Sequence, residues 1–362
     1  MSVLSTFARL VPPPTFMQLP SVGVDISDTS LKYMQFVPRY GHQVTYVIDS
    51  WGEVDIPDGV LERGQVHEVG KLADVLSEMG RSTNSPFVRV SLPEERAYIF
   101  ETMVRPGTPQ SEIRSQLEFR LEEHVPISPR EAFFDYDVIP SVDNNLSVSV
   151  VVYARETIMS YYEACQRAGL TPIAFEVEAQ AIARSSLPAD GMGTHMVVDF
   201  GKTRTGVGIV HNGILLYTST IEIGGADLSR ALRRELGERP ETELTKIKNT
   251  QGLVPKQHEP IIYETLLTAV AGIKDELATR LQYWHSQERN LEHRPIKSII
   301  LCGGSCNLKG VTEYLTETLG IPVYRPNVWR NISFHNHAIP PIERRFSYGY
   351  ATTIGLALKH TV

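Results

Sequence analysis

The sequence predicts an α/β protein with two related lobes that face a cleft, and a small α/β module inserted between them. Three observations support this prediction. An element with an apolar strand, an Asp and a polar turn occurs twice, at residues 24–30 and 198–204. Residues 93–170, between the two copies, have the pattern of a separate unit. The chain has 362 residues, which at roughly 150 residues per domain indicates two lobes rather than one core.

The composition excludes several classes of protein. Hydrophobic residues make up 42% and charged residues 21% of the chain, which is ordinary for a globular protein. The formal net charge of −7, without a sustained Lys/Arg stripe, argues against a nucleic-acid partner. The chain has no apolar stretch near the roughly 20 residues that span a bilayer, and residues 1–20 make a poor signal peptide. We therefore expect a cytoplasmic protein.

The three cysteines cannot form a disulfide framework, which indicates a reducing compartment. Cys302 and Cys306 together with His335 and His337 supply the atom types of a zinc site. The two pairs are far apart in the sequence, and Cys302 opens a Gly-rich turn that has another explanation. We therefore disfavour zinc.

The first lobe is expected to begin after a Pro-rich tail, residues 1–20. Alternating apolar residues at 22–26 predict a half-buried strand. The lobe comprises residues 21–92, and residues 171–193 and a C-terminal helix within 335–362 return to it. Further strands are predicted at 31–37, 44–50 and 87–92, with a helix at 66–79.

The inserted module is predicted at 93–170 from its order of strand, helix, strand, strand and helix. Its first helix, at 111–124, begins at Ser111 as a plausible N-cap and ends before Pro126. A second helix, at 156–168, ends at Gly169. A length of about 75 residues is within the range of an independent insert.

The second lobe is predicted at 194–334. It repeats the opening pattern of the first lobe, and Asn212-Gly213 is a strong signal for a hairpin. A polar helical section follows at 226–295. The late strand 296–301 leads into Gly303-Gly304-Ser305 and another helix.

The repeated turn is suited to binding phosphate. Its backbone N–H groups and hydroxyls can contact phosphate oxygens, and Asp25 and Asp199 can hold a hydrated Mg²⁺. Lys32 could bring a positive charge to the phosphates. Either turn alone is better explained as a tight hairpin. Their recurrence in the same context, with the Gly303-Gly304-Ser305 turn, favours the binding interpretation.

Other nucleotide and hydrolase motifs are absent from the sequence. No G-x-G-x-x-G opens a helix after the first strand or in the 198–208 region, and no G-x-x-x-x-G-K-[ST] or G-x-S-x-G occurs. The sequence therefore predicts neither a Rossmann nor a P-loop protein, and it lacks the commonest hydrolase signal.

These features together resemble the actin-like ATPase fold, in particular the PilM/FtsA family of type IV pilus assembly and cell-division proteins. Residues 22–32 (VGVDISDTSLK) resemble the opening strand and phosphate turn of PilM. Residues 116–127 resemble a helix of the insert that is special to PilM and FtsA, and residues 176–181 resemble the hinge segment. The resemblance covers about residues 20–330.

The resemblance implies that the cleft binds ATP or ADP with Mg²⁺. Asp25 and Asp199 would face the metal through water, Glu178 would take the place of a water-orienting acid, and Lys32 would approach the phosphates. Glu243 and Lys246 would approach the nucleoside. The remaining binding residues implied are Ser27, Asp28, Thr29, Ser30, Gly201, Lys202, Thr203, Gly224, Gly225, Gly303, Gly304 and Ser305.

The same resemblance implies the partner. The N-terminal cytoplasmic peptide of a PilN-like bitopic membrane protein would dock beside the insert, which would hold the chain at the inner face of the cytoplasmic membrane. The expected role is a scaffold of a type IV pilus or a related type II secretion machine, and the insert could also mediate homo-oligomerisation.

This sequence differs from the usual family pattern at two positions of the first phosphate turn, and both differences bear on the binding and hydrolysis of ATP. The family usually has Gly where Ser27 stands and an uncharged small residue where Asp28 stands. The Asp28 carboxylate would repel phosphate unless it turns outward. We therefore expect weak or absent ATP hydrolysis, with Lys32 and Glu178 as the candidate catalytic groups.

Two alternatives to a pilus scaffold are an FtsA-like division protein and a small-molecule kinase on the same fold. An FtsA-like chain should end in a basic amphipathic helix, which the last residues do not predict. A kinase needs a catalytic Asp in the cleft. The tandem acids Asp135 and Asp137 look more like a solvated strand face.

Overall fold

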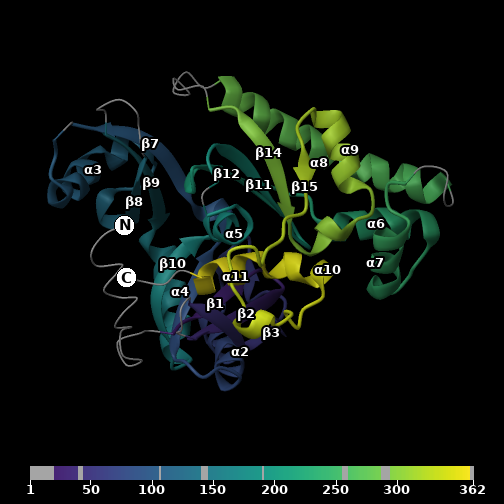
Figure 1. The fold of residues 1–362 in the computed structure, drawn as a ribbon, viewed down its shortest axis with the longest axis horizontal. Coiled ribbons are helices and arrows are strands. Elements are labelled where there is room, and N and C mark those ends of the chain that lie inside the picture. The colour runs from purple at the N-terminus through teal and green to yellow at the C-terminus, as the bar shows by residue number, and fades with distance from the viewer. Residues whose placement is uncertain are drawn as a thin grey trace.

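The computed structural model describes residues 20–39, 44–105, 107–139, 146–189, 191–254, 260–286 and 294–358. The predicted tail, residues 1–20, lies outside these ranges except for its last residue. The described part forms two large lobes and a small module (Figure 1). The lobes confirm the predicted actin-like α/β fold, and each is built on a five-stranded sheet.

The first lobe is built on a mixed sheet with the strand order β10-β6-β1-β2-β3. Strands β1, β2 and β3 form an antiparallel meander, and β6 and β10 continue parallel to β1. Helix α2 packs five apolar side chains, among them Leu72 and Leu76, into the core. The elements are β1 (Val22–Ile26), β2 (Ser30–Arg39), β3 (Thr45–Asp55), β4 (Leu61–Glu62), β5 (Gln65–Val66), α2 (Val69–Arg81), β6 (Phe87–Leu92) and β10 (Thr171–Val177).

The second lobe repeats this arrangement with the strand order β13-β12-β11-β14-β15. The meander β11–β13 is antiparallel, and β14 and β15 continue parallel to β11. The strands and helices are β11 (Thr194–Phe200), β12 (Thr205–His211), β13 (Ile214–Ile221), α6 (Gly225–Leu236), α7 (Glu241–Thr250), α8 (Pro260–Ser286), β14 (Ile296–Cys302), α9 (Val311–Leu319) and β15 (Val323–Tyr324). The duplication predicted from the two Asp turns is therefore present in the sheet topology.

The module between the lobes has its own sheet and a small core of its own. The sheet has the order β7-β9-β8, and its core includes Phe100, Leu117 and Val150. It lies at the far end of the molecule from α6 and α7 (Figure 1). Its elements are β7 (Tyr98–Val104), α3 (Gln110–His124), β8 (Ala132–Ile139) and β9 (Leu146–Ala154).

Helix α4 (Arg155–Arg167) falls within the predicted range of the module, but it packs mainly against the first lobe. It lies against α2, and its buried residues Tyr161, Ala164 and Cys165 belong to the larger core of the two lobes. These three residues lie on one face of the helix, and their burial places α4 against the first lobe. The order of elements along the chain does not predict this placement.

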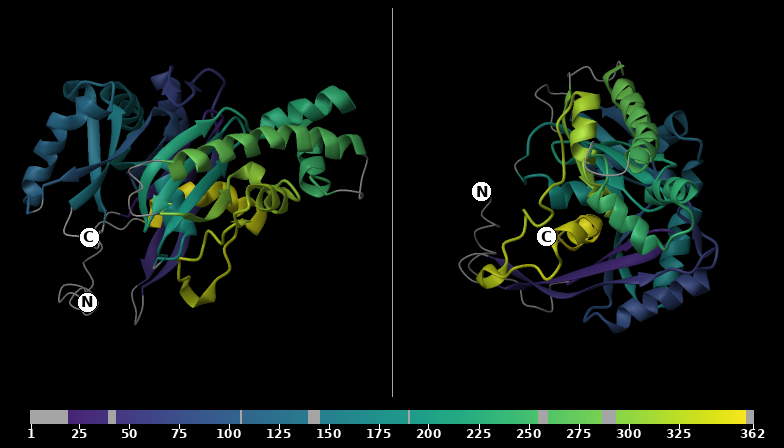
Figure 2. Two further views of the ribbon diagram at one scale, coloured as in Figure 1. Left: turned by 90° about the horizontal axis from the view of Figure 1, so that it is seen from above. Right: turned by 90° about the vertical axis from the view of Figure 1, so that its right-hand side faces the viewer.

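The lobes meet at the hinge, where α5 (Glu178–Ser186) packs against α11 (Ala351–Leu358). A Cβ at Gly355 would lie 1.8 Å from the carbonyl oxygen of Ala181, so only glycine allows this approach. The two views of Figure 2 place the last segments, drawn in yellow, between the two lobes. Within the described ranges, no helix combines the length and apolar character needed to cross a membrane.

Candidate functional site

A cavity of about 340 Å³ lies between the lobes, where the two Asp turns face each other. Asp25, Lys32 and Asp199 line it, and so do the three glycine-containing turns of the second lobe. The sequence-predicted residues that it brings together are Asp25, Ser27, Thr29, Ser30, Lys32, Asp199, Gly201, Lys202, Gly225, Gly303, Gly304 and Ser305.

Strands β1 and β2 place Asp25 and Lys32 opposite each other in the antiparallel register. Asp25 accepts a 2.8 Å hydrogen bond from Ser91 Oγ on β6. Lys32 Nζ lies 3.0 Å from Glu53 and donates to Ser30 Oγ. Burial tends to raise the pKa of Glu53, but Lys32 and two hydrogen bonds outweigh it and lower the pKa overall. Lys32 and Glu53 therefore form an ion pair at the cavity wall.

Asp28 turns away from the cavity, so its carboxylate does not oppose a phosphate group there. Its oxygens accept the backbone N–H groups of Arg63 and Gly64 at 3.1 and 3.2 Å. They also face the guanidinium of Arg204, which lies 2.8 Å away. Of the orientations considered for Asp28 from the sequence, the structure has the outward one.

The glycines of the second lobe make room beside Asp199. A Cβ at Gly303, which has a φ of +85°, would lie 2.4 Å from Asp199 Oδ1. A Cβ at Gly225 would lie 2.1 Å from Ser305 Oγ, and this hydroxyl donates to the carbonyl of Gly201. The three turns therefore meet with backbone against backbone, which leaves N–H groups close to the cavity.

Two predicted residues of the turns lie just outside the cavity lining. Gly224 packs against the β11–β12 turn, where a Cβ would lie 2.5 Å from the carbonyl oxygen of Lys202. The Gly224 N–H is bound by Asp227 at the start of α6. Thr203 is exposed on the same turn. Gly224 and Thr203 therefore contribute to the β11–β12 turn or its packing without lining the cavity.

Helix α7 presents a different face from the one the resemblance implied. Glu243 and Lys246 are exposed, and Glu243 pairs with Arg239 instead of lining the cavity. Glu241 and Lys248 line it, with Thr245 and Asn249 beside them. A helix has 3.6 residues per turn, so positions 241, 245 and 248 share one face and positions 243 and 246 do not.

Lys248 is the most enclosed polar residue of this helix, with 9% of the residue exposed. Its ammonium donates to the Gly225 carbonyl at 3.0 Å and to Ser229 Oγ at 2.7 Å, and it lies 3.3 Å from Glu241. Burial lowers the pKa of Lys248, while Glu241 acts to raise it. This network ties α7 to the start of α6 at one wall of the cavity.

Glu178 lies beside the cavity at the start of α5 and shares a hydrogen bond with Glu94, a residue that the sequence did not single out. Glu94 also accepts the Ala179 N–H at 3.0 Å. Burial raises the pKa of Glu94 to about 8 and that of Glu178 well above its ordinary value. The raised pKa values favour a protonated pair, in which one carboxyl group can donate to the other.

The pKa values of Asp25 and Asp199 are also raised. Burial and then the neighbouring Asp25 raise the pKa of Asp199 to about 7, with Lys32 acting in the opposite direction. Burial likewise raises the pKa of Asp25, against the effects of Lys32 and of the Ser91 hydrogen bond. A cation bound beside the two carboxylates would favour their ionised forms.

The donor set fits a nucleotide with a hydrated Mg²⁺. Two carboxylates and no closed cage suit a metal that keeps most of its water ligands. Among the described residues, no group of three His, Cys, Asp or Glu side chains converges as a dedicated metal site. The space beside Asp199, which a Cβ at position 303 would fill, and the N–H groups of the turns suit phosphate oxygens.

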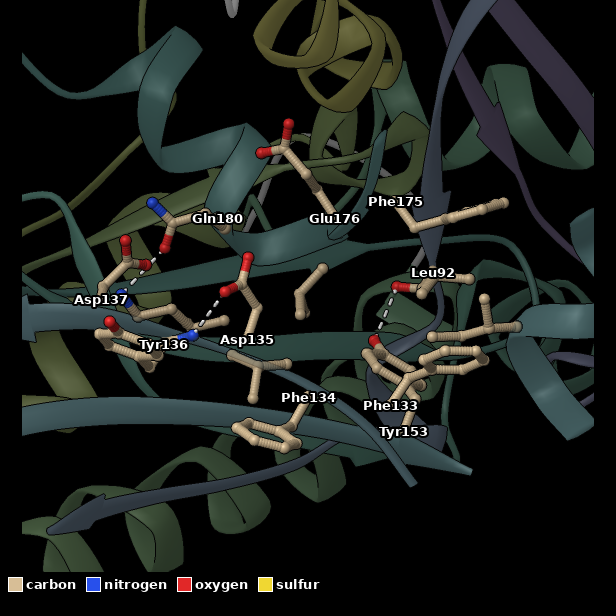
Figure 3. Close-up of a pocket in the computed structure, with 14 residues that line it drawn as sticks. Leu92, Phe133, Phe134, Asp135, Tyr136, Asp137, Tyr153, Phe175, Glu176 and Gln180 are labelled. Atoms are coloured by element: carbon tan, nitrogen blue, oxygen red, sulfur yellow. Dashed lines mark hydrogen bonds between the residues drawn. The ribbon is translucent and has the colours of Figure 1, made fainter. Parts of the chain in front are cut away.

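A second concave site lies beside the inserted module, at the junction with the first lobe. This groove has a volume of about 330 Å³ and runs between β8 and the β10–α5 junction (Figure 3). Figure 3 shows the aromatic rings of β8 and β9 on one side and Glu176 with Gln180 on the other. The residues that line it are Leu92, Phe133, Phe134, Asp135, Tyr136, Asp137, Val151, Tyr153, Ile158, Phe175, Glu176, Val177, Gln180 and Leu215.

Strands β8 and β10 are edge strands of their sheets. In the described part of the chain, β8 pairs with β9 alone and β10 with β6 alone. The groove therefore combines two sheet edges, aromatic surface and the carboxylates of Asp135, Asp137 and Glu176. Asp135 and Asp137, the tandem acids considered for a kinase, line this groove and not the cavity between the lobes.

Five residues beside or within the cavity were not predicted from the sequence: Glu94, Glu53, Ser91, Glu241 and Lys248. A signal exists for Glu94, because Glu94-Glu95 directly follows the buried strand Phe87–Leu92 and a proline. The helix period would have found Glu241 and Lys248, which are seven residues apart on one face. Glu53 and Ser91 have no such signal, since only strand pairing places them beside Lys32 and Asp25.

Comparison with solved structures gives the same fold. A chain of a PilM–PilN type IV pilus biogenesis complex is 21% identical, with a TM-score of 0.76 over 94% of this chain and 98% of that one. MreB5 of Spiroplasma citri bound to AMPPNP is 13% identical, with a TM-score of 0.53 over 93% and 94%. The ethanolamine utilization protein EutJ from Carboxydothermus hydrogenoformans is 17% identical, with a TM-score of 0.51 over 96% and 90%.

The sequence profile of the type IV pilus assembly protein PilM matches residues 23–361, which is nearly the whole chain. With the duplicated sheets, the inserted module and the cavity between the Asp turns, this match shows that the chain belongs to the PilM family of type IV pilus assembly proteins.

Proposed function

We propose that this protein is an ATP-binding scaffold at the inner face of the cytoplasmic membrane, where it binds the N-terminal peptide of a PilN-like bitopic membrane protein. The observation that carries the proposal is the presence of two separate sites. The cavity between the lobes has the chemistry for nucleotide, and the groove beside the module has the chemistry for a peptide. The machine served is a type IV pilus or a related type II secretion system.

The groove suits an extended peptide. It lies between the edge strands β8 and β10, and an extended peptide can lie along such a groove with its side chains in alternate positions. The aromatic rings of Phe133, Tyr136 and Phe175 provide apolar contacts, and Asp135 and Asp137 favour a basic residue. The match to a chain of a PilM–PilN complex supports a PilN-like partner.

The peptide site can be tested by charge reversal. Fluorescence anisotropy would measure the affinity of a labelled synthetic peptide that corresponds to the cytoplasmic N-terminal segment of the PilN-like protein. We expect Asp135→Lys with Asp137→Lys to weaken binding about tenfold or more. The control is Asp74→Lys with Glu78→Lys on the exposed face of α2, which makes the same change in net charge. Equal affinities of the two double variants would overturn the peptide site.

Nucleotide binding rests on the cavity between the lobes. Lys32, the glycine turns and the Asp pair would hold ATP or ADP, and Mg²⁺ would bring positive charge to the phosphates and carboxylates. Calorimetry with ADP and Mg²⁺ should show micromolar binding that Asp199→Ala abolishes and Asp74→Ala leaves intact. The absence of heat with wild-type protein would make the scaffold independent of nucleotide.

Hydrolysis is expected to be slow or absent. The raised pKa of Glu178 leaves its carboxyl protonated and hydrogen-bonded to Glu94, so it is a poor base for water. Lys32 is partly neutralised by Glu53. Steady phosphate release at the rate of an efficient ATPase, abolished by Glu178→Gln, would contradict this expectation.

A further inference from the structure

One arginine directly joins the β1–β2 turn, residues 27–29, to the β11–β12 turn, residues 201–204. These are called the two phosphate turns below. Arg204 follows β11 in the second lobe, and its Nη2 lies 2.8 Å from Oδ1 of Asp28 in the β1–β2 turn of the first lobe. Its Nη1 lies 2.6 Å from Oε1 of Glu95, just after β6. The contact with Glu95 lacks hydrogen-bond alignment, so ionic attraction joins those two groups.

The first lobe holds Asp28 firmly in place for this contact. Its carboxylate accepts the N–H groups of Arg63 and Gly64 from the β4–β5 turn. The carbonyl of Gly64 in turn accepts a 3.0 Å hydrogen bond from Tyr161 on α4. Arg96 donates to the carbonyl of Arg63 at 3.0 Å. The acceptor side of the ion pair is therefore fixed by several elements of the first lobe.

The ion pair is enclosed. The side chains of Arg204, Asp28 and Glu95 are only 13%, 15% and 14% exposed, so solvent and salt screen them weakly. A second pair across the lobes, Arg63 with Glu222, has a longer distance of 3.4 Å and side chains that are 73% and 57% exposed. Exposed pairs of that kind contribute little, which makes the second pair a natural control.

Removing Arg204 would do more than delete an attraction. Asp28 and Glu95 would then face each other without their shared cation, close to the carboxyl groups of Glu94 and Glu178. Like charges repel strongly where solvent is largely excluded. Arg204 belongs to the second lobe and both acids belong to the first, so separation of the lobes would not part the acids but would expose them to water, which screens their repulsion.

We propose that Arg204 is an interlobe latch, which holds the two phosphate turns together when the cleft is empty and so favours the closed arrangement of the lobes. The inference does not depend on nucleotide binding, because every contact that carries it lies within the chain itself. An actin-like protein without a charged residue at position 28 would lack this device.

The latch can be tested without any ligand. Spin labels on Asp58→Cys and Thr242→Cys, both at exposed positions, would report the width of the cleft mouth by pulsed electron spin resonance in EDTA. The native cysteines Cys165, Cys302 and Cys306 are buried, and burial raises the pKa of each thiol, so they should not react. We expect one narrow distance distribution in the parent protein.

Arg204→Gln should shift most molecules to longer and broader distances, and Arg63→Gln should leave the distribution unchanged. Asp28→Asn removes one of the two contacts and should widen the cleft partially, which keeps the test available if Arg204→Gln fails to fold. Arg204→Lys retains the charge but cannot bridge both acids, so an intermediate distribution is expected. Unchanged distances in Asp28→Asn, together with unchanged distances or failure to fold in Arg204→Gln, would overturn the latch.

Discussion

Glu176 and Glu178 are separated by a single residue, yet they belong to different sites. Glu176 lines the groove and pairs with Arg184, whereas Glu178 shares a hydrogen bond with Glu94 beside the cavity. The β6 segment has the same division, with Leu92 in the groove and Glu94 buried beside Glu178, just outside the cavity lining. Two adjacent chain segments therefore reach both sites.

This arrangement predicts that the peptide protects backbone amides beyond the groove. Binding should order the β10–α5 junction and slow hydrogen exchange at Ala179, whose N–H is bonded to Glu94. Exchange measured by mass spectrometry with and without the synthetic peptide would check this. Helix α8 lies outside both segments and should be unaffected. Protection confined to β8 would contradict the prediction.

The stability of the ligand-free protein should depend on the ionisation of Glu94. Its pKa is raised from about 4.5 to about 8 by burial, so the folded state binds a proton more tightly than the unfolded state does. The stabilisation is complete below about pH 4.5 and is lost as the pH rises towards 8.

Glu94→Gln should therefore flatten this dependence, by up to roughly 2 kcal/mol between pH 6 and pH 8. Urea unfolding of the two proteins at a series of pH values would measure it. Glu78→Gln, on the exposed face of α2, should keep the parent slope. A parallel pair of curves for Glu94→Gln and the parent would show that Glu94 does not titrate in this range.

Gly303→Ala should destabilise the fold more than Gly59→Ala. Both residues have a positive φ, of +85° and +79°, so both substitutions incur backbone strain, and the ψ of 163° at Gly303 is accessible essentially to glycine alone. A Cβ at position 303 would also collide with Asp199 and with the backbone of Phe200, whereas a Cβ at position 59 meets nothing within 4 Å. The collision should add about 1–3 kcal/mol. Equal melting temperatures would show that the turns can separate without cost.

The two lysines of α7 should differ in their effect on nucleotide affinity. Lys248→Met removes the ammonium that ties Glu241 and Ser229 to the start of α6, and it leaves Glu241 without this partner at the cavity wall. We expect a loss of about tenfold or more in the affinity for ADP with Mg²⁺. Lys246→Met, on the exposed face, should bind like the parent. Calorimetry would measure both affinities. A weaker affinity in Lys246→Met than in Lys248→Met would show that the face with Glu243 and Lys246 contacts the nucleotide.

The sequence by itself determined the duplicated fold and much of the lining of the cavity between the lobes. A strand that ends in Asp before a polar turn is a local pattern, and it occurred twice in chain order. The position of Asp25, Lys32, Asp199 and the Gly303 turn at one cavity follows from that repeat, because equivalent strand ends of two similar sheets meet at the same cleft.

Only the tertiary structure decided which helix face and which acids the sites use. Glu241 and Lys248 line the cavity and Glu243 and Lys246 do not, because the packing of Leu244 and Ile247 sets the rotation of α7. Glu94 reaches Glu178, and Arg204 reaches Asp28, across more than 80 residues of chain. The first pair depends on the pairing of β6 with β10, and the second depends on how the lobes dock. Local patterns in the sequence carry no record of either arrangement.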